Sequence, residues 1–212
     1  MTRVVEGLGR KWLWPDEDHE CIKVIFDWMS DLDRAVKFCK QRRTAIQAGG
    51  NMGVWPWRLT HMFAHVVTTE PDPECKALMF ENLRDTPNID MYSAALMDRD
   101  DWSLRLHIEP RNRGAQYVEP FLGNHALKCM TIDSLGLADC DLIYLDIEGA
   151  ELKAIQGAVN TIWQSKPVIA FEDKNLSTRF GTNKYDTEKW IARELGYKVV
   201  ARYHNDVVMT CE

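Results

Sequence analysis

Short apolar runs alternate with helix-like stretches from residue 44 to the end of the chain, and this alternation restricts the fold more than any other feature. Strands that alternate with helices favour a parallel sheet with helices on both faces. Only His204 and Asn205 separate the last two runs, so these strands are expected to pair as an antiparallel hairpin. The sequence therefore predicts an α/β fold with a mainly parallel, seven-stranded sheet and an antiparallel C-terminal hairpin.

The individual elements follow from the spacing of apolar residues. Strands of the sheet are expected at residues 44–48, 65–69, 91–96, 142–147, 168–171, 197–203 and 206–210, with an extra strand at 104–108 in an insertion. Helices are expected at residues 21–41, 54–63, 73–84, 151–164 and 187–195. The run at 142–147 is almost entirely apolar, which is typical of a strand buried on both faces.

The 212 residues are expected to form a single domain. Residues 1–20 are interpreted as an N-terminal arm that packs Trp12 and Trp14 against the domain. Residues 21–41 are expected to form one leading helix, because apolar residues recur at every third or fourth position. The α/β core then spans residues 44–212.

Composition and charge exclude several classes of partner. The chain has 26 lysines and arginines against 32 aspartates and glutamates, a net charge of -6, whereas nucleic-acid-binding domains are usually basic. Its six cysteines lack the spacing of a disulfide framework or a zinc site, which is typical of reduced thiols. No signal-type segment and no run of about 18 apolar residues occurs. We expect a cytoplasmic protein without membrane or nucleic-acid partners, and a homo-oligomer stays open.

Glycines follow the first expected strand and precede a helix. Gly49, Gly50 and Gly53 surround Asn51, and glycine here lets the backbone turn sharply and approach a ligand closely. The spacing differs from G-x-G-x-x-G, which disfavours a dinucleotide phosphate loop. We interpret the loop as part of a binding site, and a tight turn without a ligand is the alternative.

Glu70 ends the second expected strand, about 20 residues after the glycine loop. In nucleotide-binding sheets an acidic residue at this spacing accepts hydrogen bonds from the ribose hydroxyls. Asp72 is expected to cap the next helix, which starts with Pro73. Glu70 is therefore predicted to bind ribose, and capping of the same helix is its alternative role.

Three further carboxylates lie where strands are expected to end. Asp146 lies near the end of the buried run at 142–147, Glu148 follows this run, and Glu172 follows the next strand. If the strand at 142–147 continues to residue 148, Asp146 and Glu148 point to the same side. Ligands bind outside the carboxyl ends of such strands, so all three are predicted to face one crevice. Glu151 is expected instead to stabilise the N-terminus of the following helix.

These segments together resemble the FkbM-type methyltransferases, a branch of the class I S-adenosylmethionine-dependent enzymes with a Rossmann-like fold. The resemblance is carried by AGGNMG (48–53), TEPDPE (69–74), AAL (94–96), NRG (112–114), TIDSL (131–135), LIYLDIEGAELKAIQGA (142–158), PVIAFE (167–172), LGY (195–197) and NDVVM (205–209). It implies a methyltransferase domain that uses S-adenosylmethionine and acts on a small-molecule or carbohydrate acceptor.

The resemblance also implies which residues bind the cofactor, namely Gln47, Gly49, Gly50, Asn51, Gly53, Glu70, Pro71, Ala94 and Asp146. The family usually has an acidic residue where Gln47 stands, and that residue helps to hold the methionine part of the cofactor. Gln47 accepts hydrogen bonds but carries no charge to balance the sulfonium or ammonium group. This departure keeps open a catalytically degenerate cofactor-binding or interaction domain.

Methyl transfer is an in-line displacement at a sulfonium, and a hydroxyl acceptor benefits from a general base. Asp146, Glu148 and Glu172 are the candidate catalytic residues, which predicts O-methylation with a carboxylate base. Clustered carboxylates can also hold a divalent metal, so metal dependence stays open, although no residue is assigned as a ligand.

The insertion at residues 107–125 is expected to overhang the acceptor, with Asn112 and His125 as substrate residues. A nicotinamide-dependent oxidoreductase is a further alternative. The spacing of the glycines and the antiparallel C-terminal pair both disfavour it.

Overall fold

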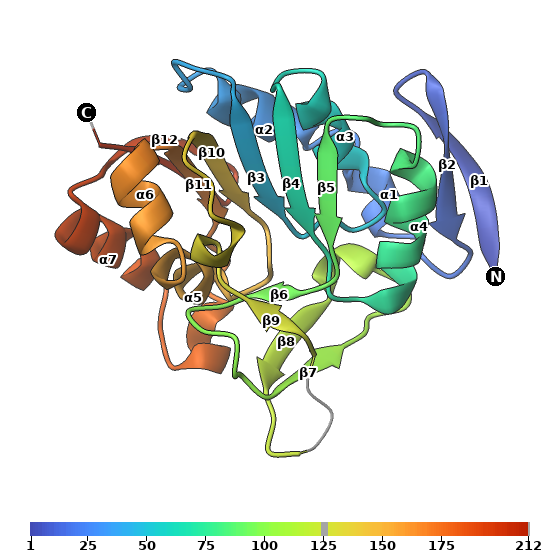
Figure 1. The fold of residues 1–212 in the computed structure, drawn as a ribbon. Coiled ribbons are helices and arrows are strands. Elements are labelled where there is room, and N and C mark those ends of the chain that lie inside the picture. The colour runs from blue at the N-terminus through green and yellow to red at the C-terminus, as the bar shows by residue number, and fades with distance from the viewer. Residues whose placement is uncertain (124–126, 212) are drawn as a thin grey trace.

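The computed structural model describes residues 1–123 and 127–211, and a seven-stranded sheet forms its centre (Figure 1). The strands lie in the order β12-β13-β11-β10-β3-β4-β5. Strand order reverses between β3 and β10, which is the position where open α/β sheets bind ligands. The bounds are β3 Thr44–Ala48, β4 His65–Thr69, β5 Ile89–Tyr92, β10 Cys140–Leu145, β11 Val168–Glu172, β12 Lys198–Tyr203 and β13 Asp206–Thr210.

The sheet is mixed. Four of its six strand pairings are parallel and two are antiparallel, because β13 runs against both β11 and β12. The predicted α/β class and the antiparallel C-terminal hairpin are confirmed. The description of the sheet as mainly parallel needs correction, since the second strand of the hairpin inserts between β11 and β12 and adds two antiparallel pairings.

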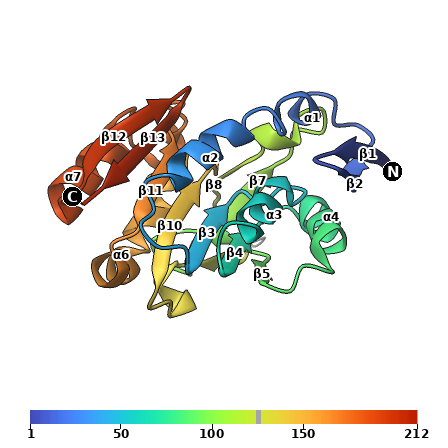
Figure 2. The same cartoon turned by 90° about the horizontal axis from the view of Figure 1, so that it is seen from above.

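Helices cover both faces of the sheet (Figure 2). α2, α3 and α4 share a core with Leu142 and Tyr144 of β10, whereas α5, α6 and α7 share the opposite core with Ile143 and Leu145. Successive residues of β10 enter opposite cores because side chains alternate along a strand. Over the described residues, no helix has the length and apolar character needed to cross a membrane. The α-helices are α1 Cys21–Val24, α2 Met29–Val36, α3 Val54–Thr60, α4 Pro73–Leu83, α5 Glu151–Gln156, α6 Val159–Ser165 and α7 Asp186–Leu195.

The N-terminal segment forms a hairpin in which β1 (Thr2–Gly7) pairs antiparallel with β2 (Arg10–Pro15). Trp12 and Trp14 of β2 are fully buried in the core shared by α2, α3 and α4. Their burial agrees with the expectation that these tryptophans pack on the domain. Trp57 of α3 meets Trp12 edge-on, with 5.6 Å between the ring centroids.

The leading helix expected at residues 21–41 is divided into α1 and α2. The chain turns over residues 25–28, where Trp28 and Asp27 both donate backbone hydrogen bonds to Val24. The carbonyl of Ile25 accepts a hydrogen bond from Trp55 Nε1 at 2.9 Å instead of continuing a helix. A tertiary contact that the local pattern does not encode thus interrupts the predicted helix.

The helix expected at residues 151–164 is likewise divided, into α5 and α6. The break falls at Gly157, whose backbone lies directly against Met97. A Cβ atom at Gly157 would stand 2.1 Å from the carbonyl oxygen of Met97. Glycine permits this close approach, and it is a poor residue for continuing a helix.

The strand expected at residues 91–96 is also two elements. After β5 the chain turns, and β6 (Ala95–Leu96) pairs in parallel with β9 (Cys129–Met130) outside the main sheet. The expected extra strand is β7 (Leu104–His107), which pairs antiparallel with β8 (Tyr117–Pro120). In Figure 1 these small sheets lie near the carboxyl ends of β3, β4 and β5.

Candidate active site

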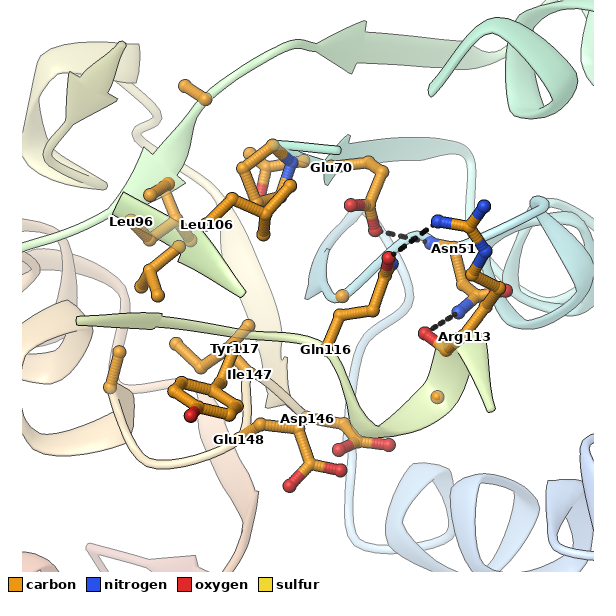
Figure 3. A pocket seen from close by; sticks show the side chains of 18 of the residues that line it. Asn51, Glu70, Leu96, Leu106, Arg113, Gln116, Tyr117, Asp146, Ile147 and Glu148 are labelled. Atoms are coloured by element: carbon orange, nitrogen blue, oxygen red, sulfur yellow. Dashed lines mark hydrogen bonds between the residues drawn. The ribbon is translucent and has the colours of Figure 1, made fainter. Parts of the chain in front are cut away.

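A cavity lies at the carboxyl edge of the sheet, next to the point where strand order reverses (Figure 3). Residues from β7, η1 (Arg113–Ala115) and β8 form the wall that faces the sheet. Its volume of ≈ 80 Å³ is below the range of about 300–1,000 Å³ that is usual for ligand sites. The predicted cofactor residues that line it are Gly49, Asn51, Glu70, Pro71, Ala94 and Asp146.

The glycine loop and the end of β10 touch through their backbones. Gly49 has a positive φ of 84°, and a Cβ there would stand 2.0 Å from the carbonyl oxygen of Asp146. The backbone N–H of Asp146 in turn donates to Ala48 at 3.1 Å. Glycine at position 49 is thus required by both the backbone angle and the close approach.

Glu70 is buried at the end of β4, with both carboxylate oxygens in use. The backbone N–H groups of Asn51 and Asp72 donate to Oε2 and Oε1, each at 2.8 Å. Burial raises the pKa of Glu70 to about 7, and the two N–H donors oppose this rise. Asp72 caps α4 as predicted, since its Oδ1 accepts the N–H of Glu74 at 2.9 Å.

Gln47, Gly50 and Gly53 lie behind the cavity wall rather than in it. Gln47 is fully buried, and its amide nitrogen donates to the carbonyls of Ala48 and Gly49 at 3.0 and 3.1 Å. Its amide oxygen accepts the hydroxyl of Thr68 at 2.8 Å. An ionised carboxylate could not donate to these carbonyls, so the uncharged residue suits this position.

Arg113 is a buried residue of the cavity that the sequence reasoning did not assign. Its guanidinium pairs with Asp72 at 3.1 Å and also with Glu74. Its backbone N–H donates to Asp18 at 2.9 Å, and its carbonyl accepts Asn51 Nδ2 at 2.9 Å. The residue therefore links the insertion to α4 and the glycine loop. The sequence feature that could have pointed to Arg113 is the NRG segment at residues 112–114, which is part of the resemblance to the FkbM-type methyltransferases.

Asp146 and Glu148 lie on the side of the cavity away from Glu70 (Figure 3). Glu172 joins them from the end of β11, and one oxygen of each carboxylate lies within 4.8 Å of the others. The structure thus brings the three predicted carboxylates together. Burial and the nearby Asp146 raise the pKa of Glu148 to about 7 and that of Glu172 to about 10, and burial also raises the pKa of Asp146.

The local geometry of these carboxylates differs from the predicted continued strand. β10 ends at Leu145, and Glu148 has a left-handed φ of 53°. Its carbonyl accepts Arg179 Nη1 at 2.6 Å, and the same guanidinium stacks over the ring of Tyr117 at 3.6 Å. Glu151 accepts the backbone N–H groups at positions 147 and 149, which stabilises the turn before α5. A turn, rather than strand alternation, therefore directs Glu148.

A second cavity adjoins the first and shares Asp146 and Glu148 with it. Lys174, which follows β11, and Asn112 of the insertion also line it, together with the partly exposed Trp28. Asn112 was predicted to contact substrate, and it is placed in this second cavity. His125, the other predicted substrate residue, lies outside the described residues.

The mixed seven-stranded sheet carries a glycine turn after β3, a buried acid after β4 and carboxylates after β10. These features are typical of the nucleotide-binding α/β domains, the class to which class I methyltransferases belong. The family model described as "Methyltransferase FkbM domain" matches residues 48–199. The chain therefore belongs to the FkbM methyltransferase family. No curated protein matches the chain.

Solved structures share the fold at low sequence identity. The methyltransferase FkbM from Methylobacillus flagellatus KT has a TM-score of 0.56 at 18% identity, over 80% of this chain and 43% of that one. This chain thus spans less than half the length of that relative. A SAM-dependent methyltransferase from Aquifex aeolicus has a TM-score of 0.51 at 10% identity, covering 92% and 95% of the two chains. Precorrin-6y C5,15-methyltransferase from Geobacter metallireducens GS-15 has a TM-score of 0.52 at 12% identity, covering 92% and 94%.

Proposed function

We propose that this chain is an S-adenosylmethionine-dependent methyltransferase that methylates a hydroxyl group of a small molecule or carbohydrate. One observation carries the proposal: Asp146 and Glu148 belong to the walls of both cavities, and Glu70 lies across the first cavity from them. A donor held by Glu70 and an acceptor in the second cavity would meet at these carboxylates. Membership of the FkbM methyltransferase family supports methyl transfer as the reaction.

The residues of the first cavity suit the parts of S-adenosylmethionine. Each oxygen of Glu70 accepts one backbone N–H and keeps a lone pair for a ribose hydroxyl. Pro71 and Ala94 offer apolar surface for the base. Asp146 Oδ1 is buried and lacks a hydrogen-bond partner among the described residues, so it can accept the ammonium group of the cofactor.

When bound, S-adenosylmethionine supplies a methyl group on a positively charged sulfonium. Glu148 is our candidate for the base that takes the proton of the acceptor hydroxyl, because a pKa of about 7 leaves much of it ionised at neutral pH. Glu172 lines neither cavity and forms the closer ion pair with Lys174, at 2.7 Å, so it is the weaker candidate. Ile25 and Trp55 line both cavities and give the junction an apolar surface.

The second cavity offers the groups that a hydroxyl compound needs. Asn112 supplies a hydrogen-bonding amide, and Trp28 supplies a flat apolar surface that is 40% exposed. Sugar rings and aromatic rings both pack on such surfaces while their hydroxyls bond to polar neighbours. This combination supports a small polyhydroxyl or phenolic acceptor.

The non-catalytic alternative depended on the missing charge at Gln47. That side chain supports the glycine loop by donating to the carbonyls of Ala48 and Gly49, which favours a loop that still binds the cofactor. An oxidoreductase would bind NAD in the same cavity. Both alternatives are separated from methyl transfer by the experiments below.

The proposed reaction is tested with S-adenosylmethionine labelled in its methyl group and a panel of sugars, polyols and phenols. The wild-type protein should label at least one hydroxyl compound, and Glu148→Gln should lower the rate by about 10²–10⁴-fold. Glu81→Gln changes an exposed glutamate of α4 and serves as the matched control. Equal rates for the wild type and Glu148→Gln would refute the assigned base. Binding of S-adenosylhomocysteine without any labelled product would favour the non-catalytic domain.

A further inference from the structure

Lys174 reaches the three carboxylates from the loop after β11. Its Nζ stands 2.7 Å from Glu172 Oε1 and 3.3 Å from Glu148 Oε1. Glu148 and Glu172 are buried and Asp146 is half-buried, whereas the lysine side chain is 30% exposed and also lines the second cavity. Its ammonium therefore neutralises part of a buried negative cluster where the two cavities meet.

The same carboxylates would suit a divalent cation if the lysine were absent. One oxygen from each of Asp146, Glu148 and Glu172 lies within 4.8 Å of the others, and carboxylate oxygens are the ligands that Mg²⁺ and Mn²⁺ prefer. A metal ion bonded at about 2.1 Å to the two oxygens that the lysine contacts, Oε1 of Glu148 and Oε1 of Glu172, would overlap the lysine ammonium. The lysine and a metal ion therefore exclude each other.

The loop that carries Lys174 is held in place on both sides of the residue. Asp173 Oδ2 accepts the backbone N–H of Tyr185 at 2.9 Å, and Asn175 Oδ1 accepts the N–H of Lys184 at 2.7 Å. A backbone fixed in this way reduces the conformational entropy lost when the ammonium is held at one position. The lysine is thus part of the local framework of the site.

We propose that Lys174 is the permanent counter-cation of the three carboxylates and takes the position that a divalent metal would otherwise occupy. Lys174 acts through Glu148 and Glu172 and is therefore a positioning residue. Its contribution to methyl transfer rests on the function proposed above. Because the lysine occupies the cation position, that transfer is expected to need no divalent metal. Its place as the cation of the cluster is independent of any acceptor and is tested separately.

Lys174→Gln removes the charge and leaves the carboxylates in place. Mn²⁺ titration, followed by electron paramagnetic resonance of free Mn²⁺, should show no saturable site in the wild type. The variant should bind Mn²⁺ with a Kd on the order of 0.1–1 mM, the range of weak carboxylate sites. Its melting temperature should rise with added Mn²⁺. Lys174→Arg keeps the charge and should not bind Mn²⁺, and the double variant Glu172→Gln/Lys174→Gln should lose the site again.

The proposal is overturned if Lys174→Gln is folded and binds no Mn²⁺. It is also overturned if wild-type protein binds Mn²⁺ and Glu172→Gln abolishes that binding. Should Lys174→Gln fail to fold alone, folding restored by Mn²⁺ supports the proposal, and failure with Mn²⁺ while Lys174→Arg folds overturns it. If Lys174→Gln gains the Mn²⁺ site but the wild-type protein transfers no methyl group, the proposed function is refuted and the role of Lys174 as counter-cation stands.

Discussion

Replacing Glu70 by glutamine should weaken the binding of S-adenosylhomocysteine while leaving the sheet intact. Each carboxylate oxygen accepts one backbone N–H, from Asn51 or Asp72, at 2.8 Å, so one lone pair on each oxygen stays available to a ribose hydroxyl. The glutamine amide has a single acceptor oxygen. One ribose hydroxyl then loses a charge-assisted hydrogen bond.

The size of the effect follows from that single bond. A hydrogen bond to a charged group contributes about 1.5–3 kcal/mol, which corresponds to an increase in Kd of about 10- to 150-fold. Isothermal titration calorimetry at a pH near 8 measures this Kd with Glu70 ionised, since its pKa is raised to about 7. Glu81→Gln, on the exposed face of α4, should bind like the wild type.

Two results would refute this reasoning. A folded Glu70→Gln protein with an unchanged Kd would show that Glu70 only stabilises the glycine loop. Equal weakening in Glu81→Gln would show that the loss does not arise at the cavity. Circular dichroism confirms that each variant is folded before its affinity is compared.

Three further outcomes are expected. Burial raises the pKa of Glu151 from 4.5 to about 7, so its stabilising contribution is complete below about pH 4.5 and is lost as the pH rises through about 7. Glu151 should accordingly contribute about 3 kcal/mol to the loss of stability between about pH 5 and 8, and Glu151→Gln should reduce the fall in melting temperature over this range by that contribution. Gly49→Ala places a methyl group against the carbonyl of Asp146 and should lower the unfolding free energy by about 1–3 kcal/mol in urea titrations. A variant as stable as the wild type would contradict this prediction. Arg113→Met leaves the buried carboxylate of Asp72 without its cation and should cost about 3 kcal/mol in the same assay, so a neutral effect would disprove this pairing.

Local sequence patterns predicted the strands of the sheet better than the helices. The bounds of β3, β4 and β13 agree with the expected ranges because short apolar runs end at clear turn residues. The leading helix was predicted as one piece because its apolar spacing continues through Ile25. Only the distant Trp55, which bonds to that carbonyl, shows why the chain turns there.

The division of the helix expected at residues 151–164 had a clearer signal in the sequence. Gly157 was visible within the apolar pattern, and glycine disfavours the interior of a helix. Its contact with the backbone of Met97 was not visible, because that contact joins segments far apart in sequence. The short pairing of β6 with β9 depends on the same kind of distant contact.

Part of the candidate site could likewise be predicted from the sequence, and part could not. Glu70 and Asp146 follow strands of the sheet, so strand order alone indicated that they share one edge. Arg113 and Arg179 lie in short 3-10 helices and Lys174 in a loop, and none was assigned because the conformation of such connections depends on packing rather than on periodicity. Two of them had an indication in the sequence: Arg113 lies in the NRG segment, and Lys174 stands two positions after the predicted Glu172.

The proposed function depends most on binding of an adenosyl methyl donor in the cavity beside Glu70. Calorimetric titration of the wild-type protein with S-adenosylmethionine, S-adenosylhomocysteine and NAD tests this claim directly. We expect micromolar binding of both adenosyl compounds and no binding of NAD. Absence of binding by either adenosyl compound, or tighter binding of NAD, would contradict it.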